Sequence, residues 1–243
     1  MESPATRPFL TARWRYLAML NYPVAPEVLA PFVPRGTELD FWQGRTYVSV
    51  VGFLFLDTRV WGFGIPHHRN FEEVNLRFYV RRQGPEGWRR GVVFVKEIVP
   101  RFAIATTARL LYGEKYVSLP MRHSITGDPN RGGMSVTYGW RHRGRWNGLG
   151  AVVSGAPEEA APGSEAEFIT EHYWGYSALR GGGCMEYRVE HPRWRVWQLE
   201  RPVLDCDVAA LYGERFVETL AGEPSSAFLA DGSEVTVYKG CKV

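Results

Sequence analysis

The sequence predicts a single α+β domain, mainly β, that is built around a curved antiparallel sheet or barrel. Aromatic residues make up 14% of the 243 residues, and large rings suit the packing of strand-rich proteins. Strand-like segments recur as hairpins, with only a few helical segments between them. Such segments also flank the one low-complexity stretch, 156–167, so we expect residues 1–243 to form one domain.

The strands are indicated by β-branched and aromatic runs that end at turn residues. The strongest is Thr46 to Thr58, where Gly52 marks a bend or a bulge. A loop at 83–87 joins two further runs into a hairpin, and residues 135–154 form another hairpin. Asp231-Gly232 predicts the turn of a final hairpin over 227–239.

Four helical segments are expected. A short helix follows the prolines at 23–26, and a longer one spans about 102–112, where apolar residues recur at helical spacing. Ser164 and Glu167 have the spacing of a capping box, which predicts a short helix from there. The last helix is expected over about 205–220.

Charge and cysteine usage exclude several classes of protein. The net charge is only +3 with acids and bases interspersed, whereas a nucleic-acid surface carries a longer basic stripe. The three cysteines form no C-x-x-C pair and indicate reduced thiols. The first residues lack an apolar signal region, and no run reaches the roughly 18 apolar residues of a membrane span. We therefore expect a soluble cytoplasmic protein that binds neither nucleic acid nor membrane; its oligomeric state is left open.

Most catalytic and metal motifs are absent. The six histidines form neither H-x-H nor H-E-x-x-H, so no metal site is expected. There is no G-x-S-x-G nucleophile and no phosphate-binding glycine loop before a helix, and no cofactor is expected.

Two stretches could carry chemistry, and each has a purely structural interpretation. Lys115 follows the helix expected at 102–112, where it is either a reactive amine beside Tyr116 or a solvated cation at a helix C-terminus. Lys96 would share a strand face with Val92, Phe94 and Ile98, pointing inward or to solvent. The aromatic stretch 171–176 around His172 is either the wall of a ligand pocket or a hydrophobic face with a hydrogen-bonded histidine.

Several strings together carry a resemblance to a known family. They are VPRFAIATTARLLYGEKYVSLPMRH, EHYWGY, VEHPRWRVW and SAFLADGSEVTVY. The chain resembles the uncharacterised YqjF-like family (domain of unknown function family 2071) from about Arg13 to Tyr238. That family is similar to acetoacetate decarboxylase, which implies a cone-shaped antiparallel β-barrel flanked by helices.

The resemblance also implies a site. By position, Lys115 corresponds to the lysine that forms a Schiff base, Glu73 to a glutamate beside the substrate, and Arg15 to an arginine for the substrate carboxylate. Tyr116 and His172 would help to wall the pocket. Glu114 stands where the decarboxylase has a second lysine, and an adjacent carboxylate favours a protonated Lys115.

Three functions stay open at this stage. The first is a barrel that binds a small apolar or carboxylate ligand in its interior without catalysing a reaction. The second is a Schiff-base-forming lyase or decarboxylase that acts on a small keto acid through Lys115. The third is a structural or interaction protein whose barrel is filled. The fold alone does not choose among them.

Overall fold

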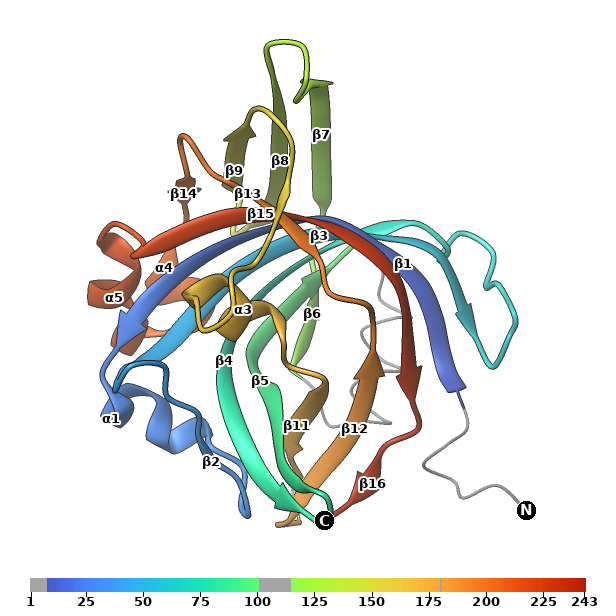
Figure 1. Ribbon diagram of the computed structural model, residues 1–243, viewed down its shortest axis with the longest axis vertical. Helices are drawn as coiled ribbons and strands as arrows, with labels where there is room; N and C mark the ends of the chain where they lie inside the picture. The colour runs from blue at the N-terminus through green and yellow to red at the C-terminus, as the bar shows by residue number, and fades with distance from the viewer. Residues whose placement is uncertain (1–7, 101–114, 180) are drawn as a thin grey trace.

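The computed structural model describes residues 8–100, 115–179 and 181–243. Its main feature is a large, strongly bent sheet, above which a second, smaller sheet rises (Figure 1). The strands are β1 (Pro8–Val24), β2 (Glu38–Leu39), β3 (Thr46–Val60), β4 (Phe71–Gly84), β5 (Gly87–Val99), β6 (Tyr116–Ser118), β7 (Met121–Asp128), β8 (Gly133–His142), β9 (Arg145–Val153), β10 (Glu158–Glu159), β11 (Trp174–Ala178), β12 (Cys184–Glu190), β13 (Arg195–Gln198), β14 (Val203–Asp205), β15 (Ser226–Tyr238) and β16 (Cys241–Lys242).

The helices of the described residues are all short. They are α1 (Pro26–Leu29), α3 (Glu165–Thr170), α4 (Val208–Tyr212) and α5 (Val217–Ala221), with 3-10 turns η2 (Ala30–Phe32) and η3 (Glu214–Phe216). None of them is long and apolar enough to cross a membrane.

The bent sheet curls into a barrel in which two of the strand pairings, β5 with β11 and β12 with β15, are short. Strands β15, β1, β3, β4 and β5 pair antiparallel in that order. Beyond β5 the sheet continues through a parallel pairing with β11 and then to β12. Strand β12 returns to β15 through the pairs Val189–Val237 and Glu190–Thr236. The predicted mainly β fold, with a curved sheet flanked by helices, is confirmed.

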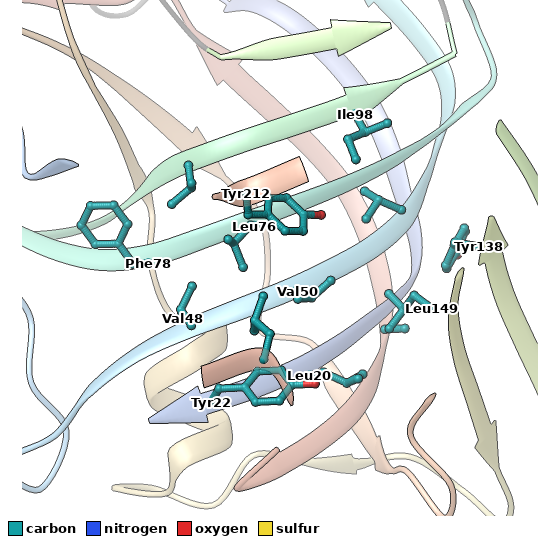
Figure 2. Packing of buried hydrophobic residues seen from close by; sticks show 14 of the residues in the cluster. Leu20, Tyr22, Val48, Val50, Leu76, Phe78, Ile98, Tyr138, Leu149 and Tyr212 are labelled. Carbon is teal, nitrogen blue, oxygen red and sulfur yellow. The ribbon is translucent and has the colours of Figure 1, made fainter. Parts of the chain in front are cut away.

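The outer face of the bent sheet carries one of two hydrophobic clusters. Strand residues such as Leu20, Val50 and Leu76 project from it, and Tyr212 of α4 packs over them (Figure 2). A second cluster, which includes Met19, lies on the inner face. Because successive residues of a strand point to opposite faces, the same strands supply both clusters.

The second sheet, in the order β14-β9-β8-β7, packs on the outer face at Gly52. A Cβ atom at Gly52 would lie 2.7 Å from Cδ2 of Tyr138 and 2.8 Å from Cδ2 of Leu149. Both side chains are buried, with 1% of each residue exposed. Glycine at this position therefore lets the two sheets approach closely.

Replacing Gly52 with alanine is expected to lower the free energy of unfolding by about 1–3 kcal/mol, because the added methyl group overpacks this contact. Gly148→Ala is a matched control in β9, since its Cβ would meet only the carbonyl oxygen of Tyr138, at 3.7 Å. The control is expected to change stability by less than about 1 kcal/mol. Urea unfolding of both variants measures the difference, and equal losses would contradict the close approach at Gly52.

Several expected elements differ in the structure. The turn predicted at Asp231-Gly232 is wrong: β15 runs through both residues without reversing, and Gly232 provides a positive φ of 80° inside the strand. The helix expected at 205–220 is interrupted at Gly213, whose φ is 99°. The helix start predicted at Ser164 is confirmed, because the Glu167 backbone N–H donates to Ser164 Oγ at 3.2 Å. The Glu167 carboxylate accepts from the backbone N–H of Gly163 at 2.7 Å and not from that of Ser164, so the reciprocal bond of a capping box is not formed. The segment 102–112 lies outside the described residues.

Candidate functional site

A cavity of about 200 Å³ lies on the inner side of the bent sheet. Most of its wall is apolar and aromatic, and the chain supplies that wall from strands far apart in the sequence. The large apolar residues that line it include Trp14, Phe53, Phe55, Phe71, Phe94 and Trp194. A concave, mostly apolar cavity with a few polar groups is typical of small-molecule sites.

Strand β4 supplies three polar residues of the wall. Glu73, Asn75 and Arg77 occupy alternate positions of this strand and all line the cavity. The residues between them, Val74 and Leu76, belong to the outer cluster. Strand alternation thus places an acid, an amide and a guanidinium side by side in the cavity.

Glu73 is 2% exposed, and its carboxyl group is held by two hydrogen bonds. Asn75 Nδ2 donates to its Oε1 at 2.9 Å, and the Tyr116 hydroxyl donates to its Oε2 at 3.3 Å. Burial raises the pKa of Glu73 to about 7, although these two hydrogen bonds and the charge of Arg77 lower it. At neutral pH, Glu73 is therefore protonated in a large fraction of molecules.

A β-bulge brings a second acid into the cavity. The register between β4 and β5 shifts between Leu76 and Arg77, so that Phe94 and Glu97 both line the cavity. Lys96 points the other way, and its amine donates to the carbonyl oxygen of Leu211. The expectation that Lys96 shares a face with Phe94 is wrong, because the extra residue at the bulge reverses the alternation.

Arg77 is the cation of the cavity. The residue is 9% exposed, and its Nη2 lies 3.4 Å from the carbonyl oxygen of Ile169 and 3.8 Å from the sulfur of Met19. Its guanidinium carbon lies 5.7 Å from the centre of the Tyr79 ring. Within the described residues, Arg77 makes no ion pair and its Nε has no hydrogen-bond acceptor. A buried charge without a counterion is costly unless a ligand supplies one.

His172 lies at the same end of the cavity, with 1% of its side chain exposed. Its Nε2 is 3.3 Å from Oδ2 of Asp40, which also accepts a hydrogen bond from Arg90 Nε at 2.6 Å. Its ring lies 4.7 Å from that of Tyr79. Burial lowers the pKa of His172 to about 4, against the hydrogen bond to Asp40, so the ring is neutral at pH 7.

The carboxylate that holds this histidine is ionised. Burial alone would raise the pKa of Asp40, but the hydrogen bonds from His172 and Arg90 keep it below its usual value. An ionised Asp40 can only accept hydrogen bonds, so Nε2 of His172 must donate to it.

Five buried polar atoms of the wall have no hydrogen-bond partner among the described residues. Burying such an atom without a partner destabilises the folded state, so a set of them in one cavity indicates that a bound molecule or water serves them. They are Trp14 Nε1, Thr58 Oγ1, Asn75 Oδ1, Arg77 Nε and His172 Nδ1.

The structure brings three of the five predicted site residues together. Glu73, Tyr116 and His172 line the cavity, whereas Lys115 and Arg15 do not. Lys115 is exposed, and its amine lies 4.6 Å from the centre of the Phe32 ring, which packs against the outer cluster. Arg15 is half-buried, and its guanidinium lies 5.5 Å from the ring of Tyr16.

Asn75 and Arg77 were not predicted as site residues, although the sequence carries a signal for them. In β4 the residues at 73, 75 and 77 are polar, whereas those at 74, 76 and 78 are apolar. A polar stripe opposite an apolar one, in a strand segment whose residues 73–80 are all buried, indicates a polar cavity. In the described part of the chain, no cluster of three His, Cys, Asp or Glu side chains could hold a metal ion.

Solved structures with the same architecture are enzymes. The enduracididine biosynthesis enzyme MppR, complexed with pyruvate, matches with a TM-score of 0.69 and 13% identity, over 100% of this chain and 91% of its own. An acetoacetate decarboxylase-like enzyme from Sphingomonas wittichii RW1 matches with a TM-score of 0.67 and 14% identity, over 100% of this chain and 97% of its own. Acetoacetate decarboxylase from Legionella pneumophila matches with a TM-score of 0.64 and 11% identity, over 100% of this chain and 90% of its own. The chain therefore has the acetoacetate decarboxylase-like fold.

Within that fold, the chain belongs to the family DUF2071, described as an uncharacterized conserved protein, whose model matches residues 11–234. Uncharacterized protein YqjF of Bacillus subtilis (strain 168) is 28% identical over 200 residues, which are 80% of this chain and 76% of YqjF. The resemblance drawn from the sequence is thus confirmed at the level of the family.

Proposed function

We propose that this protein binds a small carboxylic acid with an apolar body in the cavity of its bent sheet, with the ligand carboxylate on Arg77. The observation that carries the proposal is the Arg77 guanidinium, buried without an ion-pair partner among the described residues. A carboxylate is the natural partner for its forked donors.

Two titratable residues near Arg77, Glu73 and His172, are compatible with an anionic ligand, while Glu97 is a further acid in the cavity wall. Burial raises the pKa of Glu73 to about 7, so this neighbouring acid carries only part of a negative charge at neutral pH. His172 is neutral there, because burial lowers its pKa to about 4. The aromatic wall supplies the contact area for the apolar body of the ligand.

The similar solved structures support the same chemical class. MppR was solved with pyruvate, which is a small carboxylate. At 13% identity this likeness concerns the fold, so the support for the ligand class comes mainly from Arg77 of this chain.

The alternative of a Schiff-base lyase acting through Lys115 receives less support. All four lysines of the chain, Lys96, Lys115, Lys239 and Lys242, lie in the described residues, and none of them lines the cavity. An iminium with a ligand in the cavity would need one of them there. A cavity of about 200 Å³ also argues against the alternative of a filled barrel.

Isothermal titration calorimetry with acid and amide pairs tests the proposal. We would use the 4-methylpentanoyl chain with hydrogen, hydroxyl or oxo oxygen at C2, each as the free acid and as the primary amide. At least one acid is expected to bind, and its amide to bind at least tenfold more weakly, because the neutral amide cannot pair with Arg77.

Two arginine variants show whether Arg77 is the anchor. Arg77→Met is expected to weaken binding of the acid by about a hundredfold or more, because the charge partner is lost. Arg81→Met is the matched control: it lies on the same strand but pairs with Glu38 outside the cavity. Equal binding of acid and amide, or full affinity in Arg77→Met, would contradict the proposed function.

A further inference from the structure

His172 presents an acceptor to the cavity, not a donor. Asp40 is ionised, so His172 Nε2 carries the proton of the ring and donates it to Oδ2 at 3.3 Å. The neutral ring then holds a lone pair on Nδ1. That atom is buried, belongs to a residue that lines the cavity, and has no donor among the described residues.

The amide of Asn75 presents a second acceptor. Its Nδ2 donates to Glu73 Oε1 at 2.9 Å, which fixes the orientation of the amide and leaves Oδ1 for another contact. Oδ1 is also buried, and no donor among the described residues reaches it. The cavity wall therefore offers two acceptors beside the cation of Arg77.

His172 and Arg77 lie near each other. Both contact Tyr79, whose ring centre is 4.7 Å from the His172 ring and 5.7 Å from the Arg77 guanidinium carbon. Arg77 also donates to the carbonyl oxygen of Ile169, three residues before His172. A ligand whose carboxylate binds Arg77 therefore places its neighbouring carbon atoms close to His172.

From this arrangement we infer that the ligand is a hydroxylated acid, whose hydroxyl group donates to His172 Nδ1 while its carboxylate accepts from Arg77 Nε. The inference rests on the proposed function and names the class of acid within it. The corresponding keto acid carries acceptors only, so it would leave both His172 Nδ1 and Asn75 Oδ1 buried without a donor. A site built for a hydroxyl group rejects analogues that lack it.

Three acids that differ only at C2 provide the test: 2-hydroxy-4-methylpentanoate, 4-methyl-2-oxopentanoate and 4-methylpentanoate. Calorimetric titration of the unmodified protein is expected to show the hydroxy acid binding about tenfold to a hundredfold more tightly than the other two. If the three acids bind equally, or the keto acid binds best, water serves the two acceptors and the inference is overturned. If none of the three binds, the proposed function itself fails, which is a different result.

Variants then assign the preference to the histidine. His172→Phe keeps a ring against Tyr79 and Phe168 but removes Nδ1, so the hydroxy acid is expected to lose its advantage over 4-methylpentanoate. His123→Phe is the control, because His123 pairs with a carboxylate of Glu72 at 2.6 Å outside the cavity. A preference that survives in His172→Phe would overturn the role of Nδ1. The ligand series on the unmodified protein decides the ligand class even if this variant does not fold.

Discussion

Replacing Glu73 with glutamine is expected to raise the free energy of unfolding at pH 8 by about 3 kcal/mol relative to the unmodified protein. Burial raises the pKa of Glu73 to about 7, whereas a glutamic acid in the unfolded chain titrates near 4.5. Between these two values the unfolded state has lost the proton that the folded state still binds, so stability falls as the pH rises. A difference of about 2.5 pKa units corresponds to about 3 kcal/mol.

The difference in unfolding free energy between Glu73→Gln and the unmodified protein is expected to depend on pH. Below pH 4, where both states hold the proton, Glu73→Gln is expected to be close to the unmodified protein in stability; its amide can still interact with Asn75 and Tyr116. The advantage grows between about pH 4.5 and 7 and is then constant. Urea unfolding at five pH values measures it, with Glu72→Gln as a control at the adjacent position, which does not line the cavity. A variant that is equally or less stable at pH 8 would contradict the raised pKa.

Much of the fold could be predicted from the sequence, because alternation and turn residues act locally. The long strand expected at Thr46 to Thr58 is present within β3, and the bend expected at Gly52 is where the second sheet approaches. The error at Asp231-Gly232 has a physical reason. A glycine that supports a positive φ serves equally well in a hairpin turn or inside a continuous strand, and the neighbouring strand β1 decides which.

The candidate site was less predictable, because its partners are distant in sequence. Asp40 and His172 are 132 residues apart, and no local pattern joins them. The bulge in β5 turns Glu97 into the cavity and Lys96 away from it, although a regular strand would do the reverse. The resemblance and the aromatic stretch pointed to Glu73, Tyr116 and His172, which line the cavity. The polar stripe at Glu73, Asn75 and Arg77 is also present in the sequence, but its meaning depends on the opposite face being covered.

The lysines of this chain lie outside the cavity, although the fold is shared with acetoacetate decarboxylase. The resemblance to acetoacetate decarboxylase directed attention to Lys115, yet the cavity wall of this chain is built around Arg77, Glu73 and His172. A guanidinium does not form an iminium, but it binds a carboxylate well. Under the proposed function, a few side chains on the inner face of this architecture provide carboxylate binding in place of iminium formation.

The effect of His172→Phe on the free energy of unfolding is expected to depend on pH in the opposite direction to that of Glu73→Gln. Burial lowers the pKa of His172 to about 4, while a histidine in the unfolded chain titrates near 6.5. Between these values the unfolded state binds a proton that the folded state does not, so the histidine's contribution to stability is present above 6.5 and is lost as the pH falls toward 4. Relative to the unmodified protein, the variant is expected to gain about 3 kcal/mol of unfolding free energy between pH 7 and pH 4.

Glu73 and His172 thus act in opposite directions over the same range. From about pH 4.5 to 6.5 the folded state keeps one extra proton on Glu73 and lacks one on His172, so their contributions to the slope of stability against pH nearly cancel. Each single variant exposes the slope of the other residue: stability should rise with pH in Glu73→Gln and fall with pH in His172→Phe. Urea unfolding across this range, with the double variant included, measures both slopes. If stability has the same slope against pH in both single variants, Glu73 is not buried with its proton and His172 is not buried without one. The proposed ligand contacts of this cavity depend on these two protonation states.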